Sequence, residues 1–440
     1  MNTIHARAAL TDAGWLESAS ISIGNDGLIH GVTVGDPMPG DHRVDLLVPG
    51  MPDAHSHAFQ RGIAGLTEAA GGGGNDSFWT WRERMYQAIQ GLDARALHDT
   101  ALDLYQGLRA RGYTSVAEFH YVHRLGGSSA EETADALVQA ARTAGLRILL
   151  LPVLYRRGGL DGSPLSARQA GFKLDLDEYG TLLQKLRSAA ARHPHLSLGI
   201  APHSVRSVSA DDLTEALRLR QAIIPGCPVH IHISEQQAEV EDAKRHLGTT
   251  PVAWLCDHAP VDGAWVLVHA THATDDELLL AREREAVICI CTTTEANLGD
   301  GVFEIERWWQ LGGSLAIGSD SNVCLDPSEE LRWLEYQARL RRQRRARLLE
   351  ADSLHPGTSL WIRSVAGGRR AMGWRSPGIG PGAPAELLAV AVSDSTLSPD
   401  EAMDDLVFAQ RATRLQPLSA NLPGSGPETP ASGDRLVPQA

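Results

Sequence analysis

The sequence contains little lysine and little cysteine, and it has no long apolar run. Only three of its 440 residues are lysine, at Lys173, Lys185 and Lys244, so chemistry that needs a lysine has three candidates. The five cysteines are an odd number and form no Cys-x-x-Cys pair, which argues against a disulfide framework or a cysteine-based zinc site. The longest apolar run, 148–154, is far shorter than the roughly 18 residues that indicate a membrane span.

The chain also lacks a surplus of positive charge. Its 40 Lys and Arg residues stand against 54 Asp and Glu residues, giving a formal net charge of -14 at pH 7. Binding to a nucleic-acid backbone needs a basic face, so we expect no nucleic-acid partner. The first residues show no basic segment followed by an apolar one, so they do not have the pattern of a secretory signal. We therefore expect a cytoplasmic protein with reduced thiols and no membrane partner.

Short apolar runs ended by polar residues recur along the chain and predict eight strands. Helical apolar spacing lies between them, most clearly at 94–112 and 211–223. This alternation, with continuously apolar strands, is typical of an α/β fold in which parallel strands form a TIM-like (β/α)8 barrel. The alternative is an open doubly wound sheet, but polar residues end nearly every strand instead of gathering at one switch point. The predicted strands are 46–57, 114–121, 146–155, 196–204, 228–235, 264–272, 286–294 and 314–321.

The two chain ends predict a second, smaller domain. The N-terminal part contains strand-like pieces without a helix, and residues 373–393 contain two turn clusters followed by a strand. We expect 1–48 and 365–410 to form a small β-sandwich domain beside a barrel at 49–364. Residues 419–440 are rich in Pro, Gly and Ser and predict a disordered tail. The segment GGGGND at 71–76 is either a lid over the site or a passive surface loop.

The strongest sign of chemistry is the pair His55 and His57. Residues i and i+2 of a strand face the same side, so these imidazoles can hold one cation together at the end of the first strand. His232, His269 and Asp320 end the fifth, sixth and eighth predicted strands, and such strand ends meet at one face of a barrel. Two or three imidazoles with a carboxylate suit zinc or iron(II). Five such residues on matching strand ends argue against the alternative of satisfied polar core residues.

Two neighbours of His232 have different expected roles. His230 lies two residues earlier on the same side of the strand, so we expect it one layer deeper, as a core histidine rather than a ligand. Glu235 lies just past the strand end, where a carboxylate can transfer protons to and from an activated water. The alternative for Glu235 is a solvated residue beside a helix start that Ser234 caps.

The motifs around these residues resemble a known enzyme superfamily. Four motifs are together similar to the amidohydrolases, in their deaminase-like branch with one catalytic metal. They are MPDAHSHAFQRGIAGL, HIHISEQ, LVHATH and IGSDSN. Two-metal members carry a carboxylated lysine at the fourth strand, and no lysine lies near 196–204 here. Four further motifs are specific to a narrower group within the superfamily: FWTWRERMY, EFHYVH, APHSVR and TTTEANLGDGVF. Over roughly residues 46–325 the chain resembles the formimidoylglutamate deiminase family.

This resemblance implies a reaction and the residues that perform it. The reaction is the hydrolysis of N-formimino-L-glutamate to N-formyl-L-glutamate and ammonia, a step of histidine degradation. The implied metal ligands are His55, His57, His232 and Asp320, around one divalent ion, Zn²⁺ or Fe²⁺. Glu235 would transfer protons to and from the substrate nitrogens, and either Asp320 or His269 would take the proton of the attacking water. We also expect a homodimer.

The substrate carries two carboxylates, which need fixed cationic or hydrogen-bonding partners. The resemblance points to Arg82 and Arg206 as these partners, with Gln60, Tyr121 and His203 as further donors. Arg82 could instead be a surface helix charge, and Tyr121 could pack inside the barrel. Rival functions are deamination of a neutral ring such as guanine or a triazine, and an inactive barrel that serves as a binding protein. Two arginines argue against the first rival, and a full set of ligands argues against the second.

Two positions depart from the family pattern. Thr292 stands where the family usually has proline, in the loop of the seventh strand. After Phe408 the family continues with strands of the small domain, whereas QRATRLQPLSANLPGSGPETP does not have the pattern of a strand. We therefore expect the small domain to be incomplete.

Overall fold

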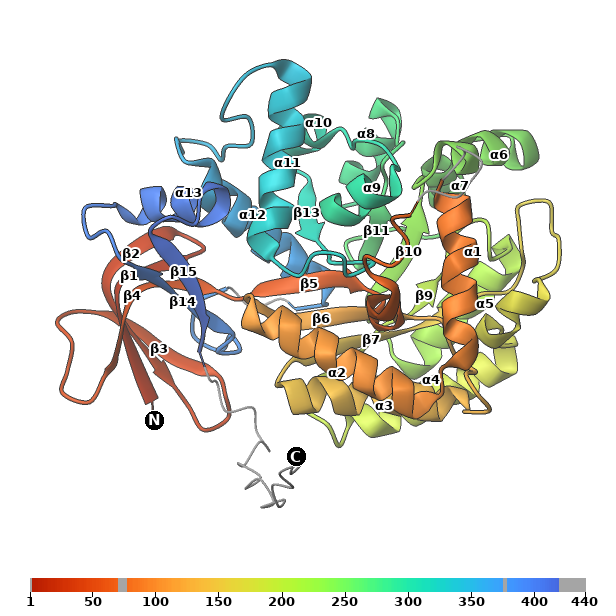
Figure 1. The fold of residues 1–440 in the computed structure, drawn as a ribbon, viewed down its shortest axis with the longest axis horizontal. Coiled ribbons are helices and arrows are strands. Elements are labelled where there is room, and N and C mark those ends of the chain that lie inside the picture. The colour runs from red at the N-terminus through yellow and green to blue at the C-terminus, as the bar shows by residue number, and fades with distance from the viewer. Residues whose placement is uncertain (1, 70–76, 375–377, 419–440) are drawn as a thin grey trace, which may run out of the picture.

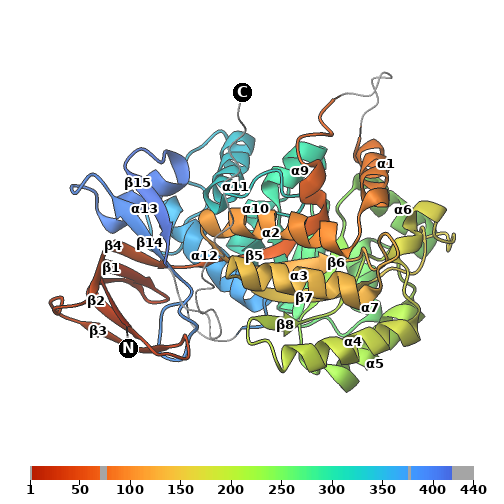
Figure 2. The ribbon, with the colours of Figure 1, turned by 60° about the horizontal axis from the view of Figure 1, so that its bottom comes forward.

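A computed structural model describes residues 2–69, 77–374 and 378–418. A barrel surrounded by helices makes up most of it, and a smaller sheet lies at one side, formed by the first and last strands of the chain (Figures 1 and 2). The predicted α/β class with a TIM-like barrel is confirmed. The glycine-rich segment 71–76 and the predicted tail 419–440 lie outside the described residues.

Two parallel sheets form the barrel. One has the order β5-β6-β7-β8, with β9 also pairing with β7, and the other has the order β10-β11-β12-β13. Parallel bridges from Ser56 to Asp320 and from Ser204 to His232 join the sheets on both sides. The strands are β5 (Met51–Ser56), β6 (Tyr113–His120), β7 (Arg147–Leu154), β8 (Leu196–Leu198), β9 (Ala201–Pro202), β10 (Val229–Ile233), β11 (Trp265–His269), β12 (Val287–Ile290) and β13 (Ser314–Ile317).

Helices between the strands cover the outside of the barrel. Their starts follow local rules: in α3, for example, Ser129 and Glu132 form a capping box, and Gly145 ends the helix with a φ of 74°. None of the helices within the described ranges is long and apolar enough to cross a membrane. These helices are α2 (Ala94–Ala110), α3 (Ala130–Ala144), α4 (Leu176–Ala190), α5 (Ala210–Ile223), α6 (Gln237–Leu247), α7 (Pro251–His258), α8 (Asp275–Glu283), α10 (Ile305–Gln310), α11 (Pro327–Arg342) and α12 (Pro356–Ala371).

Shorter elements lie in the loops after the strands. Helix η1 follows β5 directly, α1 follows η1 in the chain, and α9 follows β12, so each begins near the carboxyl end of the barrel. These elements therefore lie where the predicted site is. They are η1 (Ala58–Ile63), α1 (Phe78–Ala88), η2 (Ile89–Gly91), η3 (Ala167–Phe172) and α9 (Thr292–Leu298).

The small domain is a single six-stranded sheet with the order β15-β14-β4-β1-β2-β3. Strands from the two chain ends pair directly, since Leu387 of β14 lies opposite Pro49 of β4. The two chain ends thus form one small β domain, as predicted, but its described strands make a single sheet rather than the predicted two-sheet sandwich. Its elements are β1 (Asn2–Thr11), β2 (Gly14–Ile23), β3 (Ile29–Val34), β4 (His42–Pro49), β14 (Leu387–Val392), α13 (Pro399–Phe408) and β15 (Thr413–Pro417).

The predicted strand 46–57 is two strands, which is a correction. The chain leaves the small sheet after β4 and enters the barrel at β5, with Gly50 between them. A Cβ at Gly50 would lie 2.3 Å from the side chain of Thr114, so only glycine fits this close crossing. At the other end, α12 spans the boundary predicted at 364/365 and packs on β13 and β5.

The expectation that no strand follows Phe408 is wrong. Residues Thr413–Pro417 form β15, which pairs antiparallel with β14 at the edge of the small sheet. Only Thr413 of this strand is fully buried, while Arg414 and Gln416 are exposed. Polar and charged side chains are usual on edge strands and hide the apolar pattern that marks a central one.

This strand allows a test of where the folded chain ends. A chain that stops at Leu418 keeps all of β15, and we expect its melting temperature to stay within about 1 °C of the full chain. A chain that stops at Phe408 loses β15 and exposes the edge of β14. We expect it to melt several degrees lower or to become insoluble. Thermal unfolding of both truncated chains measures this, and equal melting of the two would show that β15 contributes nothing.

The departure at Thr292 has a local explanation. Thr292 is the first residue of α9, a position where proline is favoured because its missing N–H has no partner in the helix. The hydroxyl of Thr292 donates to the buried carboxylate of Glu330 at 2.6 Å. Burial raises the pKa of Glu330 to about 8. The threonine thus supplies this buried group with a partner that proline could not.

Candidate active site

Four side chains meet at the carboxyl end of the barrel. The Nε2 atom of His55 lies 3.2 Å from Nε2 of His57 and 3.0 Å from Nε2 of His232. Asp320 Oδ1 lies 3.5 Å from Nε2 of His55 and 3.4 Å from Nε2 of His57. All four residues are buried. The fold therefore brings the four predicted metal ligands to one point, from β5, β10 and the end of β13.

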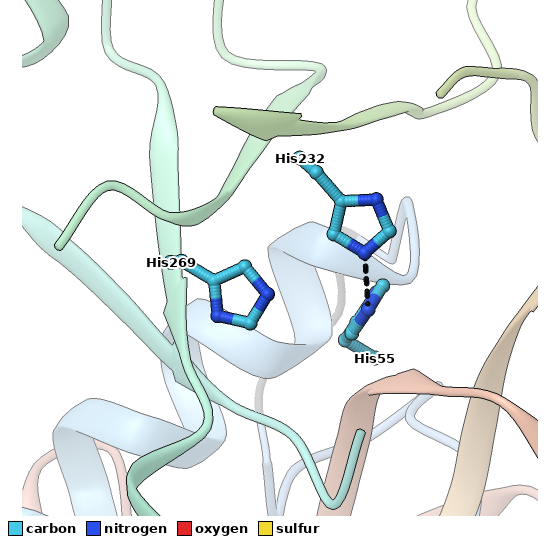
Figure 3. Close-up of side chains that lie close together, drawn as sticks. All are labelled: His55, His232 and His269. Atoms are coloured by element: carbon cyan, nitrogen blue, oxygen red, sulfur yellow. Dashed lines mark hydrogen bonds between the residues drawn. The ribbon is translucent and has the colours of Figure 1, made fainter. Parts of the chain in front are cut away.

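His269 faces the same point from the end of β11. Figure 3 shows its ring directed toward His55 and His232, which come from other strands of the barrel. Nε2 of His269 lies 3.7 Å from Asp320 Oδ2. The backbones of His269 and Asp320 are left-handed, with φ of 71° and 47°. Such strain costs free energy in a residue other than glycine and is typical of functional sites.

Hydrogen bonds around the cluster fix the direction of the rings. Nδ1 of His57 lies 3.0 Å from the carbonyl oxygen of Phe119, so Nδ1 carries the proton and the lone pair of Nε2 points into the cluster. The amide of Asn322 donates to the carbonyls of His57 and Asp320 at 3.0 and 2.9 Å. These bonds tie the end of β5 to the end of β13, where the barrel closes.

The arrangement fits a divalent metal. Nitrogen ligands about 2.0–2.1 Å from a tetrahedral zinc lie about 3.3 Å apart, close to the spacing of 3.0–3.2 Å among the Nε2 atoms here. Burial lowers the pKa of His55 to about 3, so its imidazole is neutral. Burial alone would raise the pKa of Asp320, but the histidines around it, His55 first, lower it to about 2. Neutral imidazole and ionised carboxylate are the forms that bind metal.

Glu235 and His269 lie next to each other beside this cluster. Oε1 of Glu235 lies 3.9 Å from Nε2 of His269. Burial raises the pKa of Glu235, so its carboxyl can hold a proton nearer neutral pH than an exposed glutamate does. Burial alone would lower the pKa of His269, but Glu235, Glu295 and Asp320 raise it well above its usual value. Both groups are therefore suited to proton transfer.

A pocket lies over these groups. Residues from several loops and from α1 line it, among them every residue predicted to bind substrate. Gln60 donates to the hydroxyl of Tyr121 at 3.3 Å, so these two form one hydrogen-bonded unit in the wall. Their role in binding substrate stays a prediction. The five residues are Gln60, Arg82, Tyr121, His203 and Arg206.

The two arginines meet at one aromatic ring. The guanidinium carbon of Arg82 lies 4.5 Å from the centre of the Trp79 ring, and that of Arg206 lies 5.9 Å from it. Nε of Arg82 is buried and has no hydrogen-bond partner within the described residues. Both arginines also line the pocket, so they bring two positive charges to the same part of it.

Sequence reasoning did not single out several residues of the site. Glu295 accepts from Nδ1 of His269 at 3.2 Å and from the amide of Cys291 at 3.0 Å. Glu239 is buried beside Arg206. Glu295 lies in the motif TTTEANLGDG, so its neighbourhood was visible, whereas Glu239 looks like any acid in the first turn of a helix. Tyr155 also lines the pocket. It ends the predicted strand 146–155, and a polar residue at a strand end is the same signal that pointed to the predicted metal ligands.

His230 lies deeper in the barrel than His232. Its Nε2 lies 2.9 Å from the carbonyl oxygen of Ala371 in α12, and its side chain is fully buried. It does not line the pocket. This placement is the one expected for a core histidine.

The fold and this cluster define the class of protein. The model of the amidohydrolase family matches residues 46–410, and the chain belongs to that family of metal-dependent hydrolases. It is 41% identical to the formimidoylglutamate deiminase of Pseudomonas aeruginosa, over 91% of this chain and 88% of that protein. The crystal structure of an amidohydrolase from Brucella melitensis superposes with a TM-score of 0.90 at 38% identity, covering 94% of this chain and 92% of that one.

A more distant relative is a deaminase of another kind. The 5-methylthioadenosine/S-adenosylhomocysteine deaminase of Haloarcula marismortui is 25% identical over 84% of this chain and 79% of that protein. The identity is much lower than that to the formimidoylglutamate deiminase, so the ring-deaminase alternative has less support.

Proposed function

We propose that this protein hydrolyses N-formimino-L-glutamate to N-formyl-L-glutamate and ammonia. One observation carries the proposal: two arginines whose Nε donors have no hydrogen-bond partner in the described residues line the same pocket as His57, His232 and Asp320 of the buried cluster. The enzyme is a hydrolase of carbon–nitrogen bonds in linear amidines. In the reaction, water adds to the formimino carbon, the C–NH₂ bond breaks, and a formyl group remains on the glutamate nitrogen.

The proposed ligands of one divalent metal are His55, His57, His232 and Asp320. We favour Zn²⁺ over Fe²⁺ as this metal. When bound, the metal would supply a water acidic enough to be a nucleophile near neutral pH. Among the residues that line the pocket there is no lysine, which supports one metal rather than two bridged by a carboxylated lysine. The cytoplasmic location and the homodimer stay predictions from the sequence.

Three buried groups would move the protons. Asp320, or His269 in its neutral form, would take a proton from the attacking water; both lie at the cluster, with His269 Nε2 3.7 Å from Asp320 Oδ2. Glu235 delivers a proton to the nitrogen that leaves as ammonia. Glu295 holds the Nδ1 proton of His269, which directs Nε2 of that ring into the site.

Arg82 and Arg206 would bind the two carboxylates. A guanidinium binds a carboxylate through two parallel N–H bonds, and both arginines present donors to the pocket. Gln60, Tyr121 and His203 provide further polar atoms in the same wall. A neutral aromatic ring has no carboxylate to accept the N–H donors of the two guanidinium groups.

Replacing an arginine tests this assignment. A charge-assisted hydrogen bond is worth about 1.5–3 kcal/mol, so Arg206→Met or Arg82→Met should lower kcat/KM for N-formimino-L-glutamate by about 10- to 150-fold. For an analogue in which the carboxylate bound by the replaced arginine is amidated, the same substitution should lower kcat/KM only slightly. Arg206→Lys should restore only part of the activity, because an ammonium cannot form the bidentate pair.

Steady-state rates of ammonia release with both substrates measure this effect. Damage to the barrel would slow both substrates alike, so the comparison separates binding from misfolding. If both methionine variants keep the kcat/KM of the wild type, the substrate assignment fails even if the metal site is correct, and the neutral-ring deaminase becomes the better assignment.

A further inference from the structure

Glu239 is a buried carboxylate that the proposed reaction does not use. It lies in the first turn of α6, four residues after Glu235, and its side chain is 0% exposed. Its Oε2 accepts the backbone N–H of Glu235 at 3.3 Å, and its Oε1 has no hydrogen-bond partner in the described parts of the chain. A buried carboxylate with an unsatisfied oxygen costs stability, which is typical of a residue kept for its role in a site.

Glu239 and Glu235 lie against the same guanidinium. Oε2 of Glu239 lies 3.8 Å from Nε of Arg206, and Oε2 of Glu235 lies 3.6 Å from a terminal nitrogen of Arg206. Both distances are too long for hydrogen bonds, so these are ionic contacts that leave the N–H groups available. The Arg206 side chain is only 13% exposed, and a buried cation needs opposite charge beside it.

We propose that Glu239 is a positioning residue: it balances the charge of Arg206 from behind, so that Arg206 stays available to a substrate carboxylate and Glu235 stays available for proton transfer. The inference rests on the function proposed above. Without the charge of Glu239, Glu235 is the carboxylate that remains in ionic contact with Arg206. Arg206 would then pair with Glu235 in the free enzyme, and a substrate carboxylate would have to displace that pair before binding.

The Glu239→Gln variant separates this role from a structural one. Glutamine has the same shape and can still accept the N–H of Glu235, but it lacks the charge. We expect KM for N-formimino-L-glutamate to rise about tenfold, with kcat within about twofold of the wild type. KM for the analogue amidated at the Arg206-bound carboxylate should not change. Glu241→Gln, on the exposed side of the same helix, is the matched control and should behave as the wild type.

A double variant tests the link to Arg206. If Glu239 acts through Arg206, adding Glu239→Gln to Arg206→Met should raise KM no further. Glu239→Asp keeps the charge with a shorter reach, so its KM should rise less than that of Glu239→Gln.

Several results would overturn the inference while leaving the proposed function intact. They are an unchanged KM in Glu239→Gln, a loss confined to kcat, an additive effect in the double variant, or equal KM values for Glu239→Asp and Glu239→Gln. Absence of ammonia release from N-formimino-L-glutamate by the wild type is a different outcome, because it contradicts the proposed function itself. Melting temperatures of all variants show whether each one is folded.

Discussion

His55→Ala is expected to remove bound metal and activity together. His55 is the central member of the cluster, with Nε2 3.0–3.2 Å from two other imidazoles and 3.5 Å from Asp320. Alanine removes a ligand that the remaining three cannot replace. A divalent metal lowers the pKa of bound water to about 7, so its loss should reduce turnover by more than about 1000-fold. Elemental analysis of the purified variant, beside its rate of ammonia release, measures both effects.

His230→Asn is the matched control for this variant. His230 lies in the same strand as His232 and is equally buried, but its Nε2 faces the carbonyl of Ala371 rather than the cluster. We expect this control to melt at a lower temperature yet to retain one equivalent of metal. A His55→Ala protein that keeps a full equivalent of metal would contradict the proposed ligand set. Two equivalents of bound metal per chain in the wild type, both needed for turnover, would contradict the proposed single metal.

Glu235→Gln should keep the metal and lose most of the turnover. The Glu235 carboxyl lies beside His269 and Arg206 and is not among the proposed ligands. Glutamine keeps its shape but cannot transfer a proton. General acid–base catalysis contributes about 10²–10⁴-fold to such reactions, so kcat should fall by about that factor with a much smaller change in KM.

Metal content distinguishes the two variants. Glu235→Gln should contain as much metal as the wild type, whereas His55→Ala should contain little. A Glu235→Gln enzyme that turns over at more than about a tenth of the wild-type rate would remove Glu235 from the proton-transfer role. Loss of metal from it would instead indicate that Glu235 helps to hold the ion.

The residues most easily predicted from sequence are those whose position follows from strand geometry. His55 and His57 share a side because strand side chains alternate, and His232, His269 and Asp320 meet them because parallel strands of a barrel end at one face. These contacts depend only on topology. The same reasoning placed His230 one layer deeper, where it lies.

Other features depended on contacts that no local pattern reveals. Glu239 and Glu295 are acids within helices, and only the tertiary fold buries them beside Arg206 and His269. The break at Gly50 depends on how closely the chain passes Thr114. The edge strand β15 contributes one fully buried side chain, too few to give an alternating signal.

The most direct test of the proposed function is ammonia release by purified protein of known metal content, with N-formimino-L-glutamate, guanine and a triazine as separate substrates. The structure predicts rapid release from N-formimino-L-glutamate alone, with one N-formyl-L-glutamate formed per ammonia. Release from a ring substrate, with none from N-formimino-L-glutamate, would contradict it.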